Sequence, residues 1–167
     1  EPYRRQRQMC IRDRDIGVSN KEAKQYIDNY LAHYSGVNDY MQKMIDLAKD
    51  KGYSETLYHR KRYLPELASS NHMMRAFGER VARNMPIQGT AADIIKIAMN
   101  RVYKRLLDEK LRSRLVLQVH DELLIETWKD EIPQVSRILE EEMKGAANLA
   151  VELEVDMHQG NNWYEAK

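Results

Sequence analysis

Cysteine is nearly absent, because the 167 residues include a single one, Cys10. One cysteine permits no internal disulfide and no cysteine-based zinc site, which is typical of a reducing compartment. Long apolar runs are missing as well, since none approaches the roughly 20 residues that a membrane-spanning helix needs. The polar, Arg-rich start is unlike a signal peptide. We therefore expect a soluble, cytoplasmic chain that has no membrane partner.

Neither sign of charge predominates, because 27 Lys and Arg stand against 26 Asp and Glu, a net charge of +1. The total charge therefore favours no class of partner, and its distribution along the chain must indicate one. The common catalytic templates are also missing. The patterns HExxH, GxxxxGKS or GxxxxGKT, GxSxG and GxGxxG do not occur, so zincin, P-loop, hydrolase-elbow and Rossmann sites lack their residues.

What the sequence does have is helical periodicity. Ser19 and Glu22 have the spacing of a capping box, and apolar residues follow at helical intervals as far as Tyr34. Pro86 is expected to break one helix and to begin the next. The spacing predicts helices over about residues 19–36, 38–51, 71–84, 86–110 and 135–147.

Three β segments complete the pattern. Residues 53–63 predict a hairpin whose loop holds the cationic cluster His59-Arg60-Lys61-Arg62, and residues 115–127 predict a second hairpin. Alternation over residues 151–157 predicts a strand with one buried face. We expect an α+β fold in which an antiparallel hairpin and a strand are backed by helices.

The candidate catalytic and metal-binding residues lie on the second hairpin. Leu115, Leu117 and Val119 are expected to share one face, and His120, Asp121 and Glu122 fall at the tip. Two adjacent acids can form an ordinary solvated turn, because Asp is favoured in turns. They can also hold a hard cation, because carboxylate oxygens suit Mg²⁺. A metal-dependent hydrolase centred on the same three residues would need a further His or acid nearby in space.

A polar edge is the second feature. Arg80, Asn84 and Gln88 follow at intervals of four across Pro86, so one edge presents a guanidinium and two amides if the break preserves the direction of the helix. Such groups reach phosphates, sugars and minor-groove acceptors. An ordinary polar helix face is the alternative interpretation, but the carboxylate tip and the basic loop both favour nucleic acid.

At these residues the chain resembles the C-terminal part of a family A DNA polymerase, of the bacterial DNA polymerase I type. The likeness runs from about Asp15 to Lys167 and includes GVSNKEAKQYIDNY, GYSETLYHRKRYLPEL, PIQGTAADIIK, QVHDE and NWYEAK. It implies a DNA-directed DNA polymerase that works by a two-metal mechanism. By the same resemblance, residues 15–70 end the fingers subdomain and residues 71–167 form most of the catalytic palm.

The resemblance also implies roles for single residues. Asp121 would be one of two palm aspartates that hold the catalytic Mg²⁺ ions, His120 would lie beside the primer terminus, and Glu122 would support the site. Primer-template DNA would contact a set of residues that includes the basic loop: Arg80, Asn84, Gln88, His120, Arg60 and Arg62. The other substrate would be a dNTP, and we expect a monomer associated with the nucleoid.

The chain departs from the family pattern in three places. No D-Y-S-x-I-E motif, which carries the other aspartate, occurs, and the fingers motif R-x-x-x-K-x-x-x-F-G-x-x-Y-G that grips the dNTP is absent too. Residues 1–14 match nothing in the family, and we interpret them as an unstructured junction and a sequence artefact. A truncated polymerase of this kind is expected to be inactive alone. A non-catalytic DNA-binding module derived from a palm is the alternative.

Overall fold

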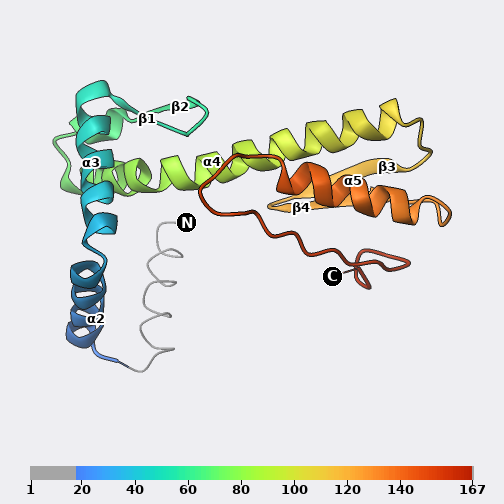
Figure 1. Ribbon diagram of the computed structural model, residues 1–167. Helices are drawn as coiled ribbons and strands as arrows, with labels where there is room; N and C mark the ends of the chain where they lie inside the picture. The colour runs from blue at the N-terminus through green and yellow to red at the C-terminus, as the bar shows by residue number, and fades with distance from the viewer. Residues whose placement is uncertain (1–17, 167) are drawn as a thin grey trace.

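One long helix, α4 (His72–Asp108), runs through the middle of the molecule, and most of the other elements attach along it (Figure 1). The computed structural model describes residues 18–166, so the predicted junction at residues 1–14 lies outside the described part. The remaining elements are α2 (Asn20–His33), α3 (Ser35–Lys51), β1 (Tyr53–Glu55), β2 (Lys61–Tyr63), the 3-10 helix η1 (Pro65–Ala68), β3 (Arg114–Val119), β4 (Glu122–Glu126) and α5 (Ile132–Lys144). The expected α+β class is confirmed.

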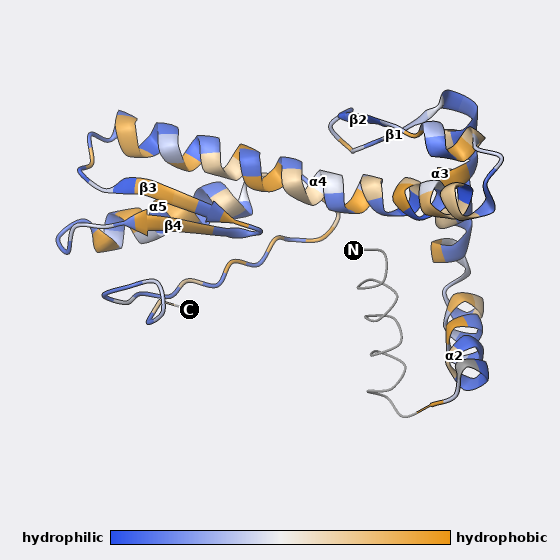
Figure 2. Cartoon of the chain, turned by 180° about the vertical axis from the view of Figure 1, so that it is seen from behind, coloured by the Kyte–Doolittle hydropathy of each residue, from blue (hydrophilic) through white to orange (hydrophobic). Residues whose placement is uncertain are grey.

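Helix α2 begins with the predicted capping box. The Ser19 side chain accepts a hydrogen bond from the Glu22 N–H, and the Glu22 carboxylate accepts one from the Ser19 N–H at 2.8 Å. This bond from the Ser19 backbone is the main reason that the pKa of Glu22 is lowered. The predicted apolar stripe is exposed, with Tyr26 at 65% and Tyr30 at 57%. Helix α2 extends away from the rest of the described chain and joins it through α3 (Figures 1 and 2).

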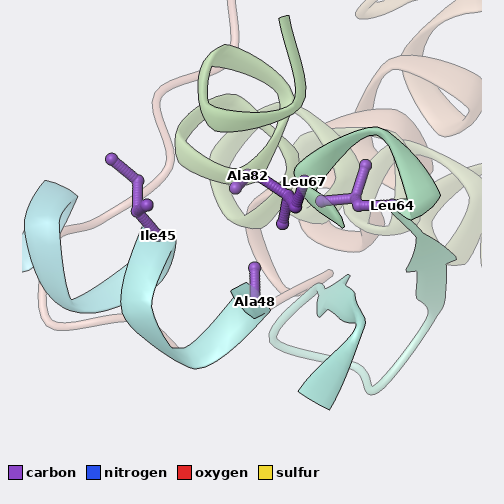
Figure 3. Close-up of a cluster of buried hydrophobic side chains, with 5 residues drawn as sticks. All are labelled: Ile45, Ala48, Leu64, Leu67 and Ala82. Atoms are coloured by element: carbon purple, nitrogen blue, oxygen red, sulfur yellow. The ribbon is translucent and has the colours of Figure 1, made fainter. Parts of the chain in front are cut away.

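The first hydrophobic core lies where α3 crosses the start of α4. Side chains from α3, from η1 with the residue before it, and from α4 meet there (Figure 3), and the cluster consists of Ile45, Ala48, Leu64, Leu67 and Ala82. Gly78 lets η1 approach closely, since a Cβ at this position would lie 3.0 Å from the Leu67 side chain. This core fixes α3 and η1 against the N-terminal half of α4.

The predicted break at Pro86 does not occur, because α4 continues through this residue. A proline removes the N–H that would bond to the carbonyl four residues earlier, which here is Ala82. That carbonyl is satisfied by Ser54 of β1, whose buried hydroxyl donates to the Ala82 oxygen at 3.3 Å. The expectation of a break was wrong because the compensating donor comes from a strand 28 residues earlier in the chain.

The β1–β2 hairpin docks on α4 through a buried carboxylate. Asp93 is 4% exposed and accepts hydrogen bonds from the Thr56 hydroxyl at 2.7 Å and from Arg60 Nε at 2.6 Å. Burial raises the pKa of Asp93, but these two hydrogen bonds and the nearby positive charge outweigh it and lower the pKa overall. Gly89 makes the approach possible, because a Cβ there would lie 2.6 Å from the Thr56 methyl group.

A second core joins the C-terminal half of α4 to α5 and the β3–β4 hairpin. It is centred on Val102, Leu106, Val135 and Ile138, and hairpin residues such as Leu115 and Ile125 pack against it. Glu131, just before α5, accepts hydrogen bonds from the Ser113 hydroxyl and from backbone N–H groups at the start of β3. These bonds lower the pKa of Glu131 to about 2, so its carboxylate ties the hairpin to α5.

The expected alternation along β3 is wrong, because a bulge interrupts it. Leu115 pairs with Ile125, but the next partner pair is Leu117 with Leu124, so Val116 is the extra residue. Residues directly opposite each other share a face of the sheet. Leu115 therefore faces the helices, while Leu117 turns away and is 41% exposed.

The predicted strand over residues 151–157 is not formed either. This segment has no regular structure, and Val151 is 77% exposed. Alternation supplies an apolar face, but a strand also needs a hydrogen-bonded neighbour. Within residues 18–166 the only strand pairs are β1 with β2 and β3 with β4.

No helix within residues 18–166 combines the length and apolarity needed to cross a bilayer.

The hydrogen bond by which Ser54 compensates for Pro86 can be tested with a double-mutant cycle. Ser54→Ala should lower the free energy of unfolding by about 1–3 kcal/mol, because it leaves the buried Ala82 carbonyl without a donor. In a Pro86→Ala background the new N–H bonds to that carbonyl, so Ser54→Ala should cost much less. Urea denaturation of the four proteins measures the coupling, and equal costs in both backgrounds would contradict the account.

The hydrogen bond from Arg60 to Asp93 predicts a contribution to stability that depends on pH. Arg60→Ala should lower the free energy of unfolding by about 1–3 kcal/mol at pH 7, because Asp93 then keeps fewer donors. The folded pKa of wild-type Asp93 is lowered, so its stabilisation is present above the unfolded value of about 3.9 and is lost as pH falls further. The gap between the two proteins should therefore shrink in acid. Arg62→Ala, two residues further along the same hairpin, is the matched control and should cost less at every pH.

Candidate nucleic-acid interface

The predicted chemical tip lies at the turn between β3 and β4. Val119 pairs with Glu122, so His120 and Asp121 form a two-residue loop and Glu122 begins β4. All three predicted site residues of the tip are exposed. His120 has a φ of 52°, a left-handed conformation that is costly for a residue with a Cβ.

One side chain holds this turn. Gln118 Nε2 donates a hydrogen bond to the backbone carbonyl of His120 at 2.6 Å, so an amide from the adjoining strand braces the strained residue. Backbone strain at an exposed tip suggests a functional constraint. The signal in the sequence was the QVHDE motif, but its letters alone did not show that Gln118 would fold back on the turn.

The predicted polar edge also exists, and it lies on a definite side of α4. Because the helix is continuous, Arg80, Asn84 and Gln88 fall within about 80° of arc, and all three are exposed. Steps of four and three residues lead on from Gln88 to Ile95, Ala98 and Val102. Those three residues are buried. The exposed polar edge is therefore the continuation of a buried stripe that leads to Val102 in the second core.

The hairpin points back toward this edge. The chain leaves the C-terminal end of α4 and turns, so β3 runs beside α4 in the opposite direction (Figure 1). Six residues of strand span about 20 Å, which equals about 13 residues of α-helix. The turn thus lies near the middle of α4, about level with Ile95, and Gln88 is only about 10 Å further along the axis. The tip and the polar edge lie along one side.

The metal donors at the tip are incomplete. Asp121 and Glu122 offer the carboxylate oxygens that Mg²⁺ prefers. Across residues 18–166, however, no group of three or more His, Cys, Asp and Glu side chains is arranged to hold a metal ion. The hydrolase alternative needed such a further ligand, and the described residues do not supply one.

The basic loop occupies a different side of α4. Arg60 is engaged by Asp93, and its side chain remains 58% exposed. Arg62 lies on β2 opposite Ser54 and is exposed. From Gln88 to Asp93 the helix turns through about 140°, so the loop and the Arg80–Gln88 edge do not form one continuous surface. Sequence alone could not show this, because the anchor Asp93 lies in an apolar run.

Comparison with known proteins shows the family of this chain. Residues 11–165 match the family described as DNA polymerase family A, a match that begins four residues before the start expected from the sequence. The chain is 49% identical over 153 residues to DNA polymerase I of Geobacillus stearothermophilus and 48% identical to that of Bacillus subtilis. Each alignment covers 92% of this chain, which spans 18% and 17% of those relatives.

A solved structure gives the same result. The POL domain of Pol1 from M. smegmatis, in complex with DNA primer-template and dNTP, superposes with a TM-score of 0.87 at 44% identity. That likeness covers 92% of this chain and 27% of the other. By sequence and by fold, this chain belongs to DNA polymerase family A.

Proposed function

We propose that this chain forms the primer-template side of the palm in a DNA-directed DNA polymerase. The observation that carries the proposal is that the hairpin bearing Asp121 packs on the side of α4 that also presents Asn84 and Gln88. A duplex on that side would have its backbone and minor groove against α4 and its growing end near the turn. The relative solved with primer-template and dNTP supports this choice of ligands.

The residue types on the edge suit a polymerase. Arg80 can contact phosphate, while the amides of Asn84 and Gln88 can donate to minor-groove acceptors. Those acceptors, purine N3 and pyrimidine O2, are present in every base pair, and G·C pairs only add the guanine N2–H donor. Contacts of this kind hold a correctly paired terminus without selecting one sequence, as copying a template requires.

Asp121 would supply one ligand of the catalytic Mg²⁺ site, with Glu122 beside it and His120 next to the primer terminus. In the two-metal mechanism the bound ions activate the primer 3′-oxygen and stabilise the departing pyrophosphate. The donors among residues 18–166 fit one side of such a site and do not complete it. We propose that the second aspartate and the residues that grip the dNTP must come from sequence that this chain does not contain.

On this basis the isolated chain binds DNA through its palm surface and does not catalyse nucleotide transfer. Exposed amides on α4 can contact a duplex by themselves, so the DNA-binding alternative describes how this chain would behave alone. The catalytic function belongs to a complete polymerase that contains these residues. The polymerase function and the DNA-binding alternative therefore use the same surface of this chain. They differ in whether the rest of a polymerase surrounds it.

Binding to a primer-template tests the surface. In a fluorescence anisotropy titration, the Asn84→Ala, Gln88→Ala double variant should weaken binding by at least about fivefold, because each of the two lost hydrogen bonds is worth about 0.5–1.5 kcal/mol. Asn100→Ala is the matched control, since Asn100 is exposed on α4 about 160° around the helix from Asn84. Equal weakening by the control would contradict the proposal, and so would Mg²⁺-dependent primer extension by the chain alone.

A further inference from the structure

The β1–β2 hairpin presents a second surface, on another side of α4 from the primer-template edge. Ser54 bonds to Ala82, and Arg60 bonds to Asp93. Ala82 and Asp93 are about 160° and 140° around the helix from Asn84 and Gln88, respectively. A duplex against the polar edge would therefore leave this hairpin uncovered.

Two tyrosines form an edge-to-face pair on the hairpin, with an angle of 66° between the ring planes. Tyr53 and Tyr63 are direct cross-strand partners, and their ring centroids are 5.8 Å apart. Because Ser54 faces α4, these neighbours in the alternation face outward. Tyr63 is 72% exposed, which is a large fraction for an aromatic ring in a strand. The pair forms an aromatic platform in which the Tyr63 ring is exposed and Tyr53 is partly buried.

Cations surround this platform. The Lys61 ammonium lies 4.5 Å from the centroid of the Tyr53 ring, and Lys51 lies 5.9 Å from it. Residues 51–63 hold four Lys and Arg and one Glu, a net charge of four minus one, or +3, whereas the whole chain carries +1. Arg60 adds a guanidinium whose Nε is fixed by Asp93 while its side chain stays 58% exposed. Positive charge is thus concentrated where aromatic rings are exposed.

We propose that the β1–β2 hairpin binds single-stranded DNA, with an unpaired base stacked on the exposed ring of Tyr63 and phosphates at Lys61 and Arg60. Proteins that bind single strands combine these two features, aromatic rings for the bases and a basic surface for the backbone. This site goes beyond the proposed palm function, because it lies on a different side of α4 and uses different residues. Duplex DNA keeps its bases paired and stacked, so it cannot use the tyrosine platform.

The test is a fluorescence anisotropy titration of the full chain with labelled oligo(dT) of about 12 nucleotides and with a blunt duplex of the same length. Tyr63→Ala should weaken oligo(dT) binding at least about fivefold, the lower end for loss of one base stack, and should leave duplex binding unchanged. Tyr63→Phe should retain the affinity. Tyr26→Ala, which removes an equally exposed tyrosine from α2, is the matched control and should have no effect.

Salt dependence tests the phosphate contacts separately. Lys61→Ala should reduce the slope of log K against log salt by about 0.7, as expected for one fewer phosphate contact to a single strand. Lys104→Ala, at an exposed position on the far half of α4, should leave the slope unchanged. Polyglutamate of the same charge should compete weakly, because it carries no bases to stack.

Three results would overturn the proposal: oligo(dT) affinity unchanged by Tyr63→Ala, an equal loss with Tyr26→Ala, or competition by polyglutamate as strong as that by unlabelled oligo(dT). Thermal unfolding monitored by circular dichroism would show that the Tyr63 variant is folded. The Asn84, Gln88 double variant should retain oligo(dT) binding at this site, so failure of the palm proposal and failure of this one give different results.

Discussion

The hydrogen bond from Ser54 to the Ala82 carbonyl is the interaction on which the arrangement depends. It supplies the donor that Pro86 cannot, and so α4 remains one helix of 37 residues. Both hydrophobic cores are built on this helix, the first near Ala82 and the second near Val102. A change of direction at Pro86 would move one core, and everything attached to it, relative to the other.

Because α4 is continuous, two of its sides contact different parts of the molecule. One side presents Asn84 and Gln88 and then, further along, packs against the hairpin that carries Asp121. The other side receives the β1–β2 hairpin through Asp93, whose hydrogen bonds offset the cost of burying a carboxylate. Gly89 is needed at that contact because the Thr56 methyl group leaves no space for a Cβ. A single straight helix can thus hold a duplex surface and a separate cationic hairpin in fixed positions.

Sequence reasoning succeeded where local chemistry decides structure. The capping box at Ser19, the end of α3 at Lys51 and both hairpins follow from short-range patterns, and the polymerase motifs identified the family. It failed where distant residues decide. A hydroxyl from Ser54 carried the helix through Pro86, a bulge at Val116 changed the face of Leu117, and residues 151–157 did not pair as a strand. The anchoring of Arg60 by Asp93 also depends on residues 33 positions apart, which no local pattern shows.

The most direct test of the central claim is the length of α4 in solution. Nitroxide labels at Met74→Cys and Lys104→Cys, both exposed positions, with Cys10→Ser to remove the native thiol, allow a distance measurement by double electron–electron resonance. One continuous helix places the two α-carbons about 45 Å apart with a narrow distribution. Two halves that met at a right angle at Pro86 would give about 32 Å, and a distribution centred there would contradict the account.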